Sequence, residues 1–415
     1  MKILILTQYF PPEVGAPQNR LFELAVRLQK AGHKITILTA MPNYPKMQIH
    51  KEYTGKWSVQ EEMEGLEVHR TCIYVPQSKG LLKRMLNYYS FVISSFVYGF
   101  FKLRRQDVLL VESPPLFLGK SAWLLSKIKG AKLIFNVSDL WPESAEKLGL
   151  VKSKLFLWLA YRLEHFLYHQ SWLITGQTQG IVKDIQQRFP KKPVYWLPNG
   201  VDLSFFFPEK SDGVDFRNKM GFSGSDFVLL YAGIIGHAQG LEVILKAAAL
   251  LKQSQFLKFV LLGSGPEKEK LLNLKRENGL SQVYFLDPVS KDQMPEIVSA
   301  CDAAIIPLRK LDLFKGAIPS KIFENLGMKK PVLLGVEGEA KTLFIDEGNS
   351  GLFFEPENGE MLSRQILKLY NNPELCRTLG ENGYNYVSGN FERDLIAKKF
   401  NQYLIDNFED CASSD

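Results

Sequence analysis

The stretch Phe314-Lys-Gly-Ala-Ile-Pro-Ser-Lys-Ile-Phe-Glu-Asn-Leu-Gly-Met-Lys-Lys-Pro331 is the most informative part of the chain. Its glycine-containing loop leads into a short predicted helix that carries Lys321 and Glu324 and stops before an apolar strand. Such a helix start offers backbone amides and the positive end of the helix dipole, which suit a phosphate. Glu324 lies one turn inside the helix, where a carboxylate can accept hydrogen bonds from paired hydroxyls such as those of a ribose. We therefore expect this segment to bind a nucleotide.

Apolar runs alternate with helical patterns along the rest of the chain, which is typical of parallel sheets covered by helices. At 415 residues the chain exceeds one ordinary core. We expect an α/β fold with two doubly wound parallel sheets, in domains 1–202 and 203–385, facing across a substrate cleft. Residues 386–415 are predicted to form a helix that returns to the first domain, and a frayed tail. The predicted strands are 2–6, 35–39, 108–111, 132–137, 172–175, 194–197, 227–232, 258–262, 283–286, 303–307, 332–336 and 351–353.

Glycine-containing loops follow three of these strands. Glycine lets backbone N–H groups approach a diphosphate closely. One such loop alone indicates only a turn, but three at strand ends, together with the Lys321 helix, predict a nucleotide site. The glycines concerned are Gly15, Gly233, Gly236, Gly263 and Gly265.

The segment Asn136–Glu143 directly follows a predicted strand and contains the best candidate for acid-base chemistry. Asp139 is expected to point into the cleft and to orient or deprotonate an acceptor hydroxyl. Trp141 would form an aromatic wall beside it. The alternative is that Asp139 caps the following helix. The sequence contains no Ser-His-Asp set and no metal-ligand cluster, so we expect no metal site.

The charge of the chain is unevenly distributed. Residues 1–200 contain 27 Lys and Arg against 14 Asp and Glu, whereas residues 201–415 contain 24 against 30. A basic half indicates contact with an anionic surface. No nucleic-acid motif is present, so we expect no nucleic acid and favour anionic lipid.

The stretch Leu81–Arg105 gives a local reason for the lipid. Its middle, Met85–Phe101, is apolar and aromatic with cations at both ends, but it is short for a membrane span. It is either a helix that lies at the membrane interface or a helix buried under its own domain. A second aromatic and basic stretch, Lys152–Trp172, favours docking. With no secretory segment and four scattered cysteines, we expect a cytoplasmic protein, peripheral on the inner face of the membrane.

Motifs in order along the chain resemble those of glycosyltransferase family 4, the retaining enzymes with the GT-B fold. The narrower resemblance is to bacterial O-antigen and capsule enzymes that transfer N-acetyl-L-fucosamine. The motifs are Tyr9–Glu13, Ala31–Ile35, Val137–Pro142, Pro198–Asp202, Gly263–Pro266, Cys301–Asp302, Ile318–Lys321 and Phe323–Gly327.

The resemblance implies retaining, metal-independent transfer of a sugar from UDP to a saccharide on a polyprenyl diphosphate, without a cofactor. We expect Asp139, Lys321 and Glu324 to be the catalytic residues, and Ser138, Asp139 and Trp141 to surround the acceptor. The family's acceptor-site histidine falls on Ser138.

The chain departs from the family in its donor site. Glu324 matches the second glutamate of the family's pair, but the first falls on Gly316. The amides of Gly316, Ala317 and Ile318 are the expected replacement. The two clamp cations are also missing, and Lys321 and Arg309 are the expected substitutes, with Ser320 at the helix start.

Two rival functions remain open at this level. A sugar-nucleotide 2-epimerase shares the two-domain design, although the expected cleft is poor in acid-base groups. A non-catalytic nucleotide-sugar-binding subunit would explain the missing glutamate and clamp cations.

Overall fold

The computed structural model describes residues 1–13, 15–44, 47–76, 81–149 and 151–410. It divides into a first unit, Met1–Asn199 with the segment from Asp394 onward, and a second unit, Gly200–Arg393. The second boundary lies later than the expected residue 385. The reason is local, because Val201 pairs with Glu392 as a β-bridge and its carbonyl accepts from the Arg393 amide at 2.9 Å. The expected tail at 411–415 lies outside the described residues.

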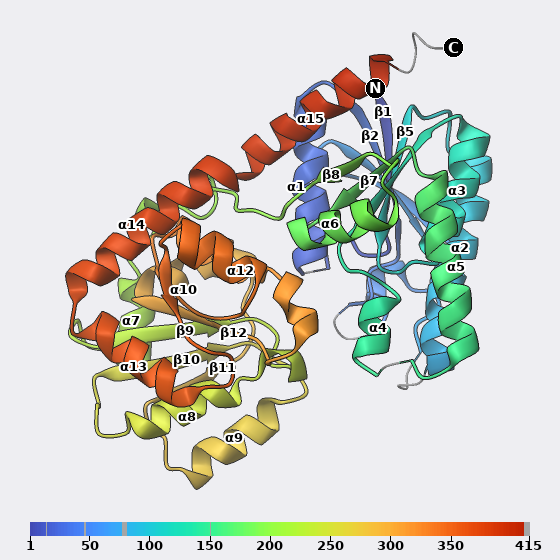
Figure 1. Ribbon diagram of the computed structural model, residues 1–415. Helices are drawn as coiled ribbons and strands as arrows, with labels where there is room; N and C mark the ends of the chain where they lie inside the picture. Colours follow the sequence, from blue (N-terminus) through green and yellow to red (C-terminus); the bar gives the residue numbers. More distant parts are fainter. Residues whose placement is uncertain (14, 45–46, 77–80, 150, 411–415) are drawn as a thin grey trace. The chain divides into compact units, whose positions relative to one another are not determined.

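The first unit contains an eight-stranded sheet in the order β3-β4-β2-β1-β5-β6-β7-β8 (Figure 1). All pairs are parallel except β3 with β4. The central strands are buried almost throughout, as expected for a sheet covered on both faces. The bounds are β1 Lys2–Leu6, β2 Lys34–Ala40, β3 Ser58–Met63, β4 Leu66–Thr71, β5 Val108–Ser113, β6 Lys132–Val137, β7 Leu173–Gly176 and β8 Val194–Trp196.

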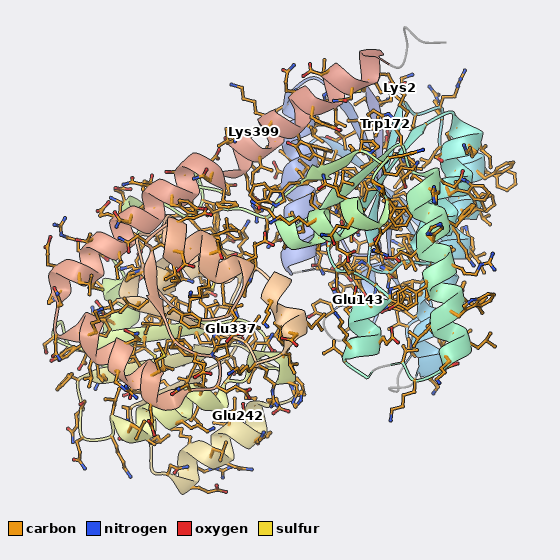
Figure 2. The ribbon with its side chains drawn as sticks, in the orientation of Figure 1. Lys2, Glu143, Trp172, Glu242, Glu337 and Lys399 are labelled. Carbon is orange, nitrogen blue, oxygen red and sulfur yellow. The ribbon has the colours of Figure 1, made fainter. Side chains whose placement is uncertain are left out.

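Helices cover both faces of this sheet, and side chains fill the space between the layers (Figures 1 and 2). On one face α1 and α15 pack against β1 and β2, and Phe400 of α15 is completely buried beside Ile3 and Ile5. On the other face lie α2, α3, α5 and α6. The bounds are α1 Ala16–Lys30, η1 Lys51–Tyr53, α2 Leu81–Lys102, α3 Leu118–Lys129, α4 Glu143–Lys147, α5 Lys154–Gln170, α6 Gln179–Arg188 and α15 Arg393–Asp410.

Helix α2 holds the apolar stretch Met85–Phe101, for which the sequence left two interpretations. Its inner face is buried, with Phe91 and Tyr98 in the core. Its outer face leaves Ile93 and Phe101 largely exposed. The inner face is therefore buried as the second interpretation expected, and contact of the outer face with a membrane stays a prediction. Within the described residues, no helix combines the length and hydropathy needed to cross a bilayer.

The second unit contains a six-stranded, wholly parallel sheet in the order β11-β10-β9-β12-β13-β14. Adjacent strands β9, β10 and β12 bring the loops at their carboxyl ends to one edge. The bounds are β9 Phe227–Ala232, β10 Leu257–Leu262, β11 Val283–Leu286, β12 Ala303–Pro307, β13 Val332–Gly335 and β14 Gly351–Phe353.

Two cores stabilise this unit. Helices α8 and α13 bury Ile244 and Ile366 against one face of the sheet. On the other face the rings of Phe323, Phe344 and Phe391 pack within 5.2–5.7 Å of one another. The helical bounds are η2 Pro208–Lys210, α7 Val214–Met220, η3 His237–Gln239, α8 Glu242–Leu250, α9 Lys268–Glu277, η4 Lys291–Gln293, α10 Met294–Ala300, η5 Asp312–Gly316, α11 Lys321–Gly327, α12 Glu339–Lys341, η6 Thr342–Glu347, α13 Gly359–Tyr370 and α14 Pro373–Asn390.

The prediction of two α/β sheets is confirmed, and each predicted strand is present within one or two residues. Strands β3 and β4, at the edge of the first sheet, were not predicted. Their polar composition does not resemble that of a buried strand, but the turn between them has the geometry of a β-hairpin. Glu64 and Gly65 have φ angles of 49° and 77°, and a two-residue loop with two positive φ angles is typical of a β-hairpin.

Candidate functional site

The loops after β9 and β10 are joined to each other by backbone hydrogen bonds. The Gly233 amide donates to the Leu262 carbonyl at 2.9 Å, and the Ile235 amide donates to the Ser264 carbonyl at 2.8 Å. In the opposite direction, the Glu267 amide donates to the Ile235 carbonyl at 3.1 Å. The two glycine loops therefore form one rigid ledge at the edge of the second sheet.

The ledge requires glycine where its two loops touch. Gly263 and Gly265 have φ angles of 150° and 155°, which L side chains rarely adopt. A Cβ on Gly263 would lie 1.9 Å from the Gly233 carbonyl oxygen, and one on Gly265 would lie 2.3 Å from the Ile235 oxygen. The main role of these glycines is thus the close approach of two backbones.

This finding corrects part of the sequence-based expectation. The amides of Gly233 and Gly263 were expected to face a diphosphate, but they donate to Leu262 and Leu286 and extend the sheet. Gly236 lies in extended backbone before η3. The ledge can shape the edge of a phosphate site, but these two amides are not available to a ligand.

We expect Gly263→Ala to destabilise the second unit by about 2–4 kcal/mol, because the new methyl group meets a fixed carbonyl at a strained φ. Thermal unfolding followed by circular dichroism measures this. Gly224→Ala is the matched control, since its Cβ would enter open space. Equal melting temperatures for the two variants would contradict the role of the ledge.

Lys321, the first residue of α11, lies beside this ledge. Its ammonium nitrogen lies 4.0 Å from the centre of the Tyr231 ring and 3.0 Å from the position of a Cβ on Gly233. The Tyr231 hydroxyl donates to the Ile234 carbonyl at 2.6 Å, which fixes the ring. Among the residues that the structure describes, no hydrogen bond or ion pair satisfies the Lys321 ammonium.

Burial lowers the pKa of Lys321 to about 8, and the charge of Glu324 acts in the opposite direction. A desolvated cation held by an aromatic face is prepared to bind an anion, because an anion stabilises the charged form that burial disfavours. Sequence analysis missed Tyr231, although it stands at the end of a strand two residues before Gly233.

Glu324 lies in the first turn of α11 and is partly buried. Its effect on the pKa of Lys321 shows that the two charges are close. Ser320 is the N-cap of the helix, and its side chain makes no capping bond. The structure therefore brings Lys321, Glu324, Gly233 and Ser320 into one local group, as predicted from their positions at strand and helix ends.

The loop before α11 fits the expectation only in part. The Ala317 amide donates to the Phe314 carbonyl at 3.0 Å, so it is not free to replace the missing glutamate. Ile318 has a largely buried side chain. A Cβ on Gly316 would meet nothing within 4 Å, so this position has room for the side chain that the family carries there.

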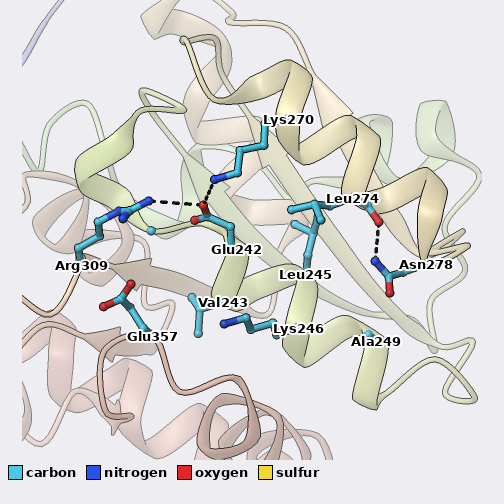
Figure 3. Close-up of a pocket in the computed structure, with 11 residues that line it drawn as sticks. Glu242, Val243, Leu245, Lys246, Ala249, Lys270, Leu274, Asn278, Arg309 and Glu357 are labelled. Carbon is cyan, nitrogen blue, oxygen red and sulfur yellow. Dashed lines mark hydrogen bonds and ion pairs between the residues drawn. The ribbon is translucent and has the colours of Figure 1, made fainter.

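Arg309 is engaged elsewhere. Its Nε donates to the His237 carbonyl at 2.6 Å, and its guanidinium lies 3.5 Å from Glu242 Oε1 (Figure 3). Lys270 approaches the same carboxylate at 2.6 Å across a pocket of about 440 Å³. No described contact joins Arg309 to Lys321, so Lys321 is the better substitute for the missing clamp.

In the first unit, Asp139 lies in the loop between β6 and α4. Its Oδ2 accepts from the Ser144 hydroxyl at 2.7 Å. Burial raises the pKa of this carboxyl, and the Ser144 bond opposes the rise. The N-cap of α4 is Pro142, and Glu143 begins the helix (Figure 2), so the capping alternative is wrong. A raised pKa makes the carboxylate a better proton acceptor.

Trp141 contributes more to packing than expected. Its ring meets those of Phe117 and Phe156 at 5.3 Å and 6.2 Å, and it borders two apolar clusters. It therefore anchors the Asp139 loop to the layer of helices below.

Ser138 ends a buried polar network that sequence analysis did not find. Arg20 donates to Glu112 Oε1 at 2.7 Å and to the Ser138 hydroxyl at 2.6 Å. Ser138 also donates to Glu112, and Asn136 donates to its other carboxylate oxygen. The hydroxyl of the half-buried Ser138 is thus engaged by Arg20 and Glu112. Glu112 itself was a signal, because a charge at the end of an apolar strand indicates a site.

Comparison with known families covers both units. Residues 214–386 match the family model of glycosyl transferases group 1, and residues 15–200 match that of the glycosyl transferase 4-like domain. The chain is therefore a glycosyltransferase that combines a glycosyl transferase 4-like domain with a group 1 glycosyl transferase domain. The prediction of a glycosyltransferase is therefore confirmed.

Individual relatives and solved structures are similar to this glycosyltransferase over nearly its whole length. WcaI of Escherichia coli strain K12, named as a glycosyl transferase of colanic acid biosynthesis, is 27% identical over 392 residues, which cover 92% of this chain and 96% of that protein. The sucrose-phosphate synthase of Thermosynechococcus elongatus has a TM-score of 0.77 at 17% identity, with 98% and 99% of the two chains covered. HepE of Anabaena, solved with UDP-glucose, has a TM-score of 0.73 at 17% identity, with 98% and 100% covered. The predicted GT-B fold is thereby confirmed.

Proposed function

We propose that this glycosyltransferase moves a sugar from UDP onto a lipid-linked saccharide with retention of the anomeric configuration. The observation that carries the proposal is the buried ammonium of Lys321, held over Tyr231 beside the ledge with Glu324 nearby. A diphosphate supplies the negative charge that this ammonium lacks, and a ribose supplies hydroxyls for Glu324. The UDP-glucose in the structurally similar HepE supports a nucleotide sugar as the donor.

In the proposed transfer, the main task of the protein is to stabilise the negative charge of the leaving phosphate, and no protein nucleophile takes part. When the bond between C1 and the phosphate oxygen breaks, UDP leaves with the electron pair and the sugar becomes positively charged. Lys321 and the first turn of α11 would stabilise the leaving phosphate, which lowers the barrier where charge develops. The acceptor oxygen then forms its bond to C1 on the face that UDP vacates.

The proton of the acceptor hydroxyl must also be removed. Before the reaction Asp139 accepts the hydrogen bond of this hydroxyl and orients its oxygen toward C1, and a phosphate oxygen of the departing UDP takes the proton as the new bond forms. The raised pKa of Asp139 supports this role, because a more basic carboxylate accepts a stronger hydrogen bond.

For the acceptor, the name of WcaI and the resemblance to O-antigen and capsule enzymes support a saccharide built on a polyprenyl diphosphate. The same resemblance supports an N-acetylated amino sugar such as N-acetyl-L-fucosamine as the transferred group. Such an acceptor places the enzyme at the inner face of the cytoplasmic membrane.

The test is incubation of the purified chain with a panel of UDP-sugars and a membrane extract that contains lipid-linked saccharides, with excess chelator in a parallel set. We expect one UDP-sugar to be consumed, with release of UDP and labelling of the lipid fraction. We also expect the rate to be unchanged within twofold by chelator, because Lys321 would take the part of a metal ion at the phosphate.

Lys321→Met provides the matched negative sample, since it removes the charge at the phosphate and keeps a side chain that packs on Tyr231. Labelling of the lipid by GDP- or dTDP-sugars in preference to UDP-sugars would contradict the proposed donor. Loss of activity in chelator would contradict the metal-independent mechanism.

A further inference from the structure

The layer of helices α2, α3 and α5 exposes apolar side chains in stripes along its outer side. On α2 the exposed residues Leu86, Ile93 and Phe100 recur every seven positions. On α5, Leu155 and Leu159 are four positions apart and lie 68% and 53% exposed. We call these ten side chains the outer face: Leu86, Ile93, Phe100, Phe101, Leu124, Ile128, Leu155, Trp158, Leu159 and Phe166.

These stripes are not the sides that pack on the sheet. Helix α5 buries Leu157, Ala160 and Leu167 toward the core, on the opposite side from its exposed stripe. Helix α2 likewise buries Phe91 and Tyr98. A surface helix normally has one apolar side, which it buries. A second apolar side over several helices indicates a surface that another body covers.

The outer face is continuous across the three helices, which lie side by side in Figure 1. Lys129 of α3 donates to the Phe100 carbonyl of α2 at 2.8 Å. Trp123 of α3 packs on Phe166 of α5, with ring centres 4.9 Å apart, and its indole N–H reaches Gln170 at 3.3 Å. The stripes therefore form one surface.

The charges that α2, α3 and α5 themselves expose have a single sign, although Glu146 of the neighbouring α4 accepts from the Tyr161 hydroxyl at the border of the face. The sequences of α2 and α3 contain no Asp or Glu, and the one acid of α5, Glu164, is 3% exposed and paired with Arg188 at 2.8 Å. Among the described side chains of the three helices, every charged group that is exposed to solvent is therefore a cation. In sequence these helices contain Lys83, Arg84, Lys102, Lys120, Lys127, Lys129, Lys154 and Arg162.

Aromatic and cationic groups also meet on α5. The Arg162 guanidinium lies 5.0 Å from the centre of the Trp158 ring, beside a groove of about 490 Å³ that Tyr161 and Phe166 help to line. Tryptophan, tyrosine and basic side chains together are typical of the boundary between headgroups and acyl chains.

We propose that the outer face is a docking surface for a bilayer that contains anionic lipids. The apolar stripes enter the acyl boundary, and the cations bind the phosphates of the headgroups. A nucleic acid would match the cations but not the stripes. This docking surface rests on the proposed lipid-linked acceptor. It extends that proposal, because it assigns the contact with the bilayer to α3 and α5 as well as to α2.

The first test removes apolar contact without changing charge. We expect the wild-type chain to sediment with vesicles that contain phosphatidylglycerol and the double variant Trp158→Ser/Leu159→Ser to bind them at least tenfold more weakly. Both side chains are 53% exposed, so their loss leaves the core intact. Leu250→Ser is the control, because this 58% exposed leucine lies on α8 of the second unit, and its vesicle binding should equal wild type.

The second test removes charge. Neutralising Lys127, Lys154 and Arg162 to Gln should weaken binding by about fivefold for each cation removed. Lys219→Gln, an exposed cation of α7, should have no effect. Phosphatidylcholine vesicles should bind weakly, and salt should weaken binding to the anionic vesicles.

Binding of UDP, measured by calorimetry without vesicles, separates docking from catalysis, and the outer-face variants should retain it. A wild-type chain that consumes UDP-sugar but sediments equally with both lipids would overturn the docking surface and leave the proposed function standing. Outer-face variants that sediment like wild type would overturn it too. So would a wild-type dimer that only these variants convert to a monomer, because a second copy would then cover the face.

Discussion

Replacing Lys321 by Met is expected to lower the rate of sugar transfer by about 100- to 1,000-fold, which is the usual cost of losing one charged donor to a developing oxyanion. The side chain of methionine has a similar length and still packs on Tyr231, but it brings no charge to the diphosphate. Steady-state kinetics with the preferred UDP-sugar measure the loss. Binding of UDP should weaken as well, because the diphosphate is present in both the donor and the product.

Lys321→Arg gives a pH-dependent control. Since burial lowers the pKa of Lys321 to about 8, its ammonium loses its proton as the pH rises through this value in the free enzyme. The ratio kcat/KM for the donor should therefore fall above pH 8 in wild type. Arginine stays charged, so Lys321→Arg should lack this fall even if its overall rate is lower.

Stability provides the second control for Lys321. The pKa in the folded state lies below the ordinary value for lysine, so burial of the protonated form opposes folding at neutral pH, and this cost disappears only at high pH. Lys321→Met should therefore melt no earlier than wild type at pH 7. A variant with normal melting and unchanged transfer would exclude Lys321 from the phosphate site.

The sequence predicted the sheets well because the signal for a buried parallel strand is local. An apolar run such as Phe227–Ala232 between turn residues has few alternatives to a strand, and the structure has β9 within the same bounds. The pattern fails where a strand is only half buried. Ser58–Met63 contains three polar or acidic residues facing solvent, and only its pairing with β4 makes it a strand.

The candidate site was predictable in position but not in its contacts. The end of a strand and the start of a helix can be read from Gly233 and Lys321 in the sequence. The partners of the polar groups cannot, because they depend on distant residues. The Gly263 amide is taken by Leu286, and Arg309 is taken by Glu242, which lies 67 residues away in the sequence.

The predicted acceptor site around Ser138 and Asp139 also depends on contacts between distant residues, which the sequence does not reveal. Arg20 and Glu112 are 92 residues apart in the sequence, and their ion pair forms because the fold brings the first turns of α1 beside the carboxyl end of β5. Their network engages the Ser138 hydroxyl, so the position on which the family's histidine falls is already hydrogen-bonded within the first unit. Asp139 therefore stays the residue of this loop that we predict to bind the acceptor.

Glu324 carries the other large expected effect. Charged hydrogen bonds contribute about 1.5–3 kcal/mol each, so the loss of two bonds to the ribose hydroxyls would weaken UDP binding by roughly 100-fold or more in Glu324→Ala. Calorimetric titration with UDP measures this. Titration with 2′,3′-dideoxy-UDP supplies the matched ligand, because it lacks both hydroxyls. Wild type should bind this analogue about as weakly as Glu324→Ala binds UDP.

Comparing both proteins with both ligands also separates a direct contact between Glu324 and the ribose from an indirect effect of Glu324 on Lys321. Glu324 raises the pKa of Lys321, so its removal also favours the neutral amine near pH 8. At pH 6.5 the amine is protonated in both proteins, and only the ribose contact remains different. A Glu324→Ala variant that distinguishes UDP from the dideoxy analogue as strongly as wild type at pH 6.5 would show that another residue binds the ribose, because a contact that Glu324 makes cannot survive its removal.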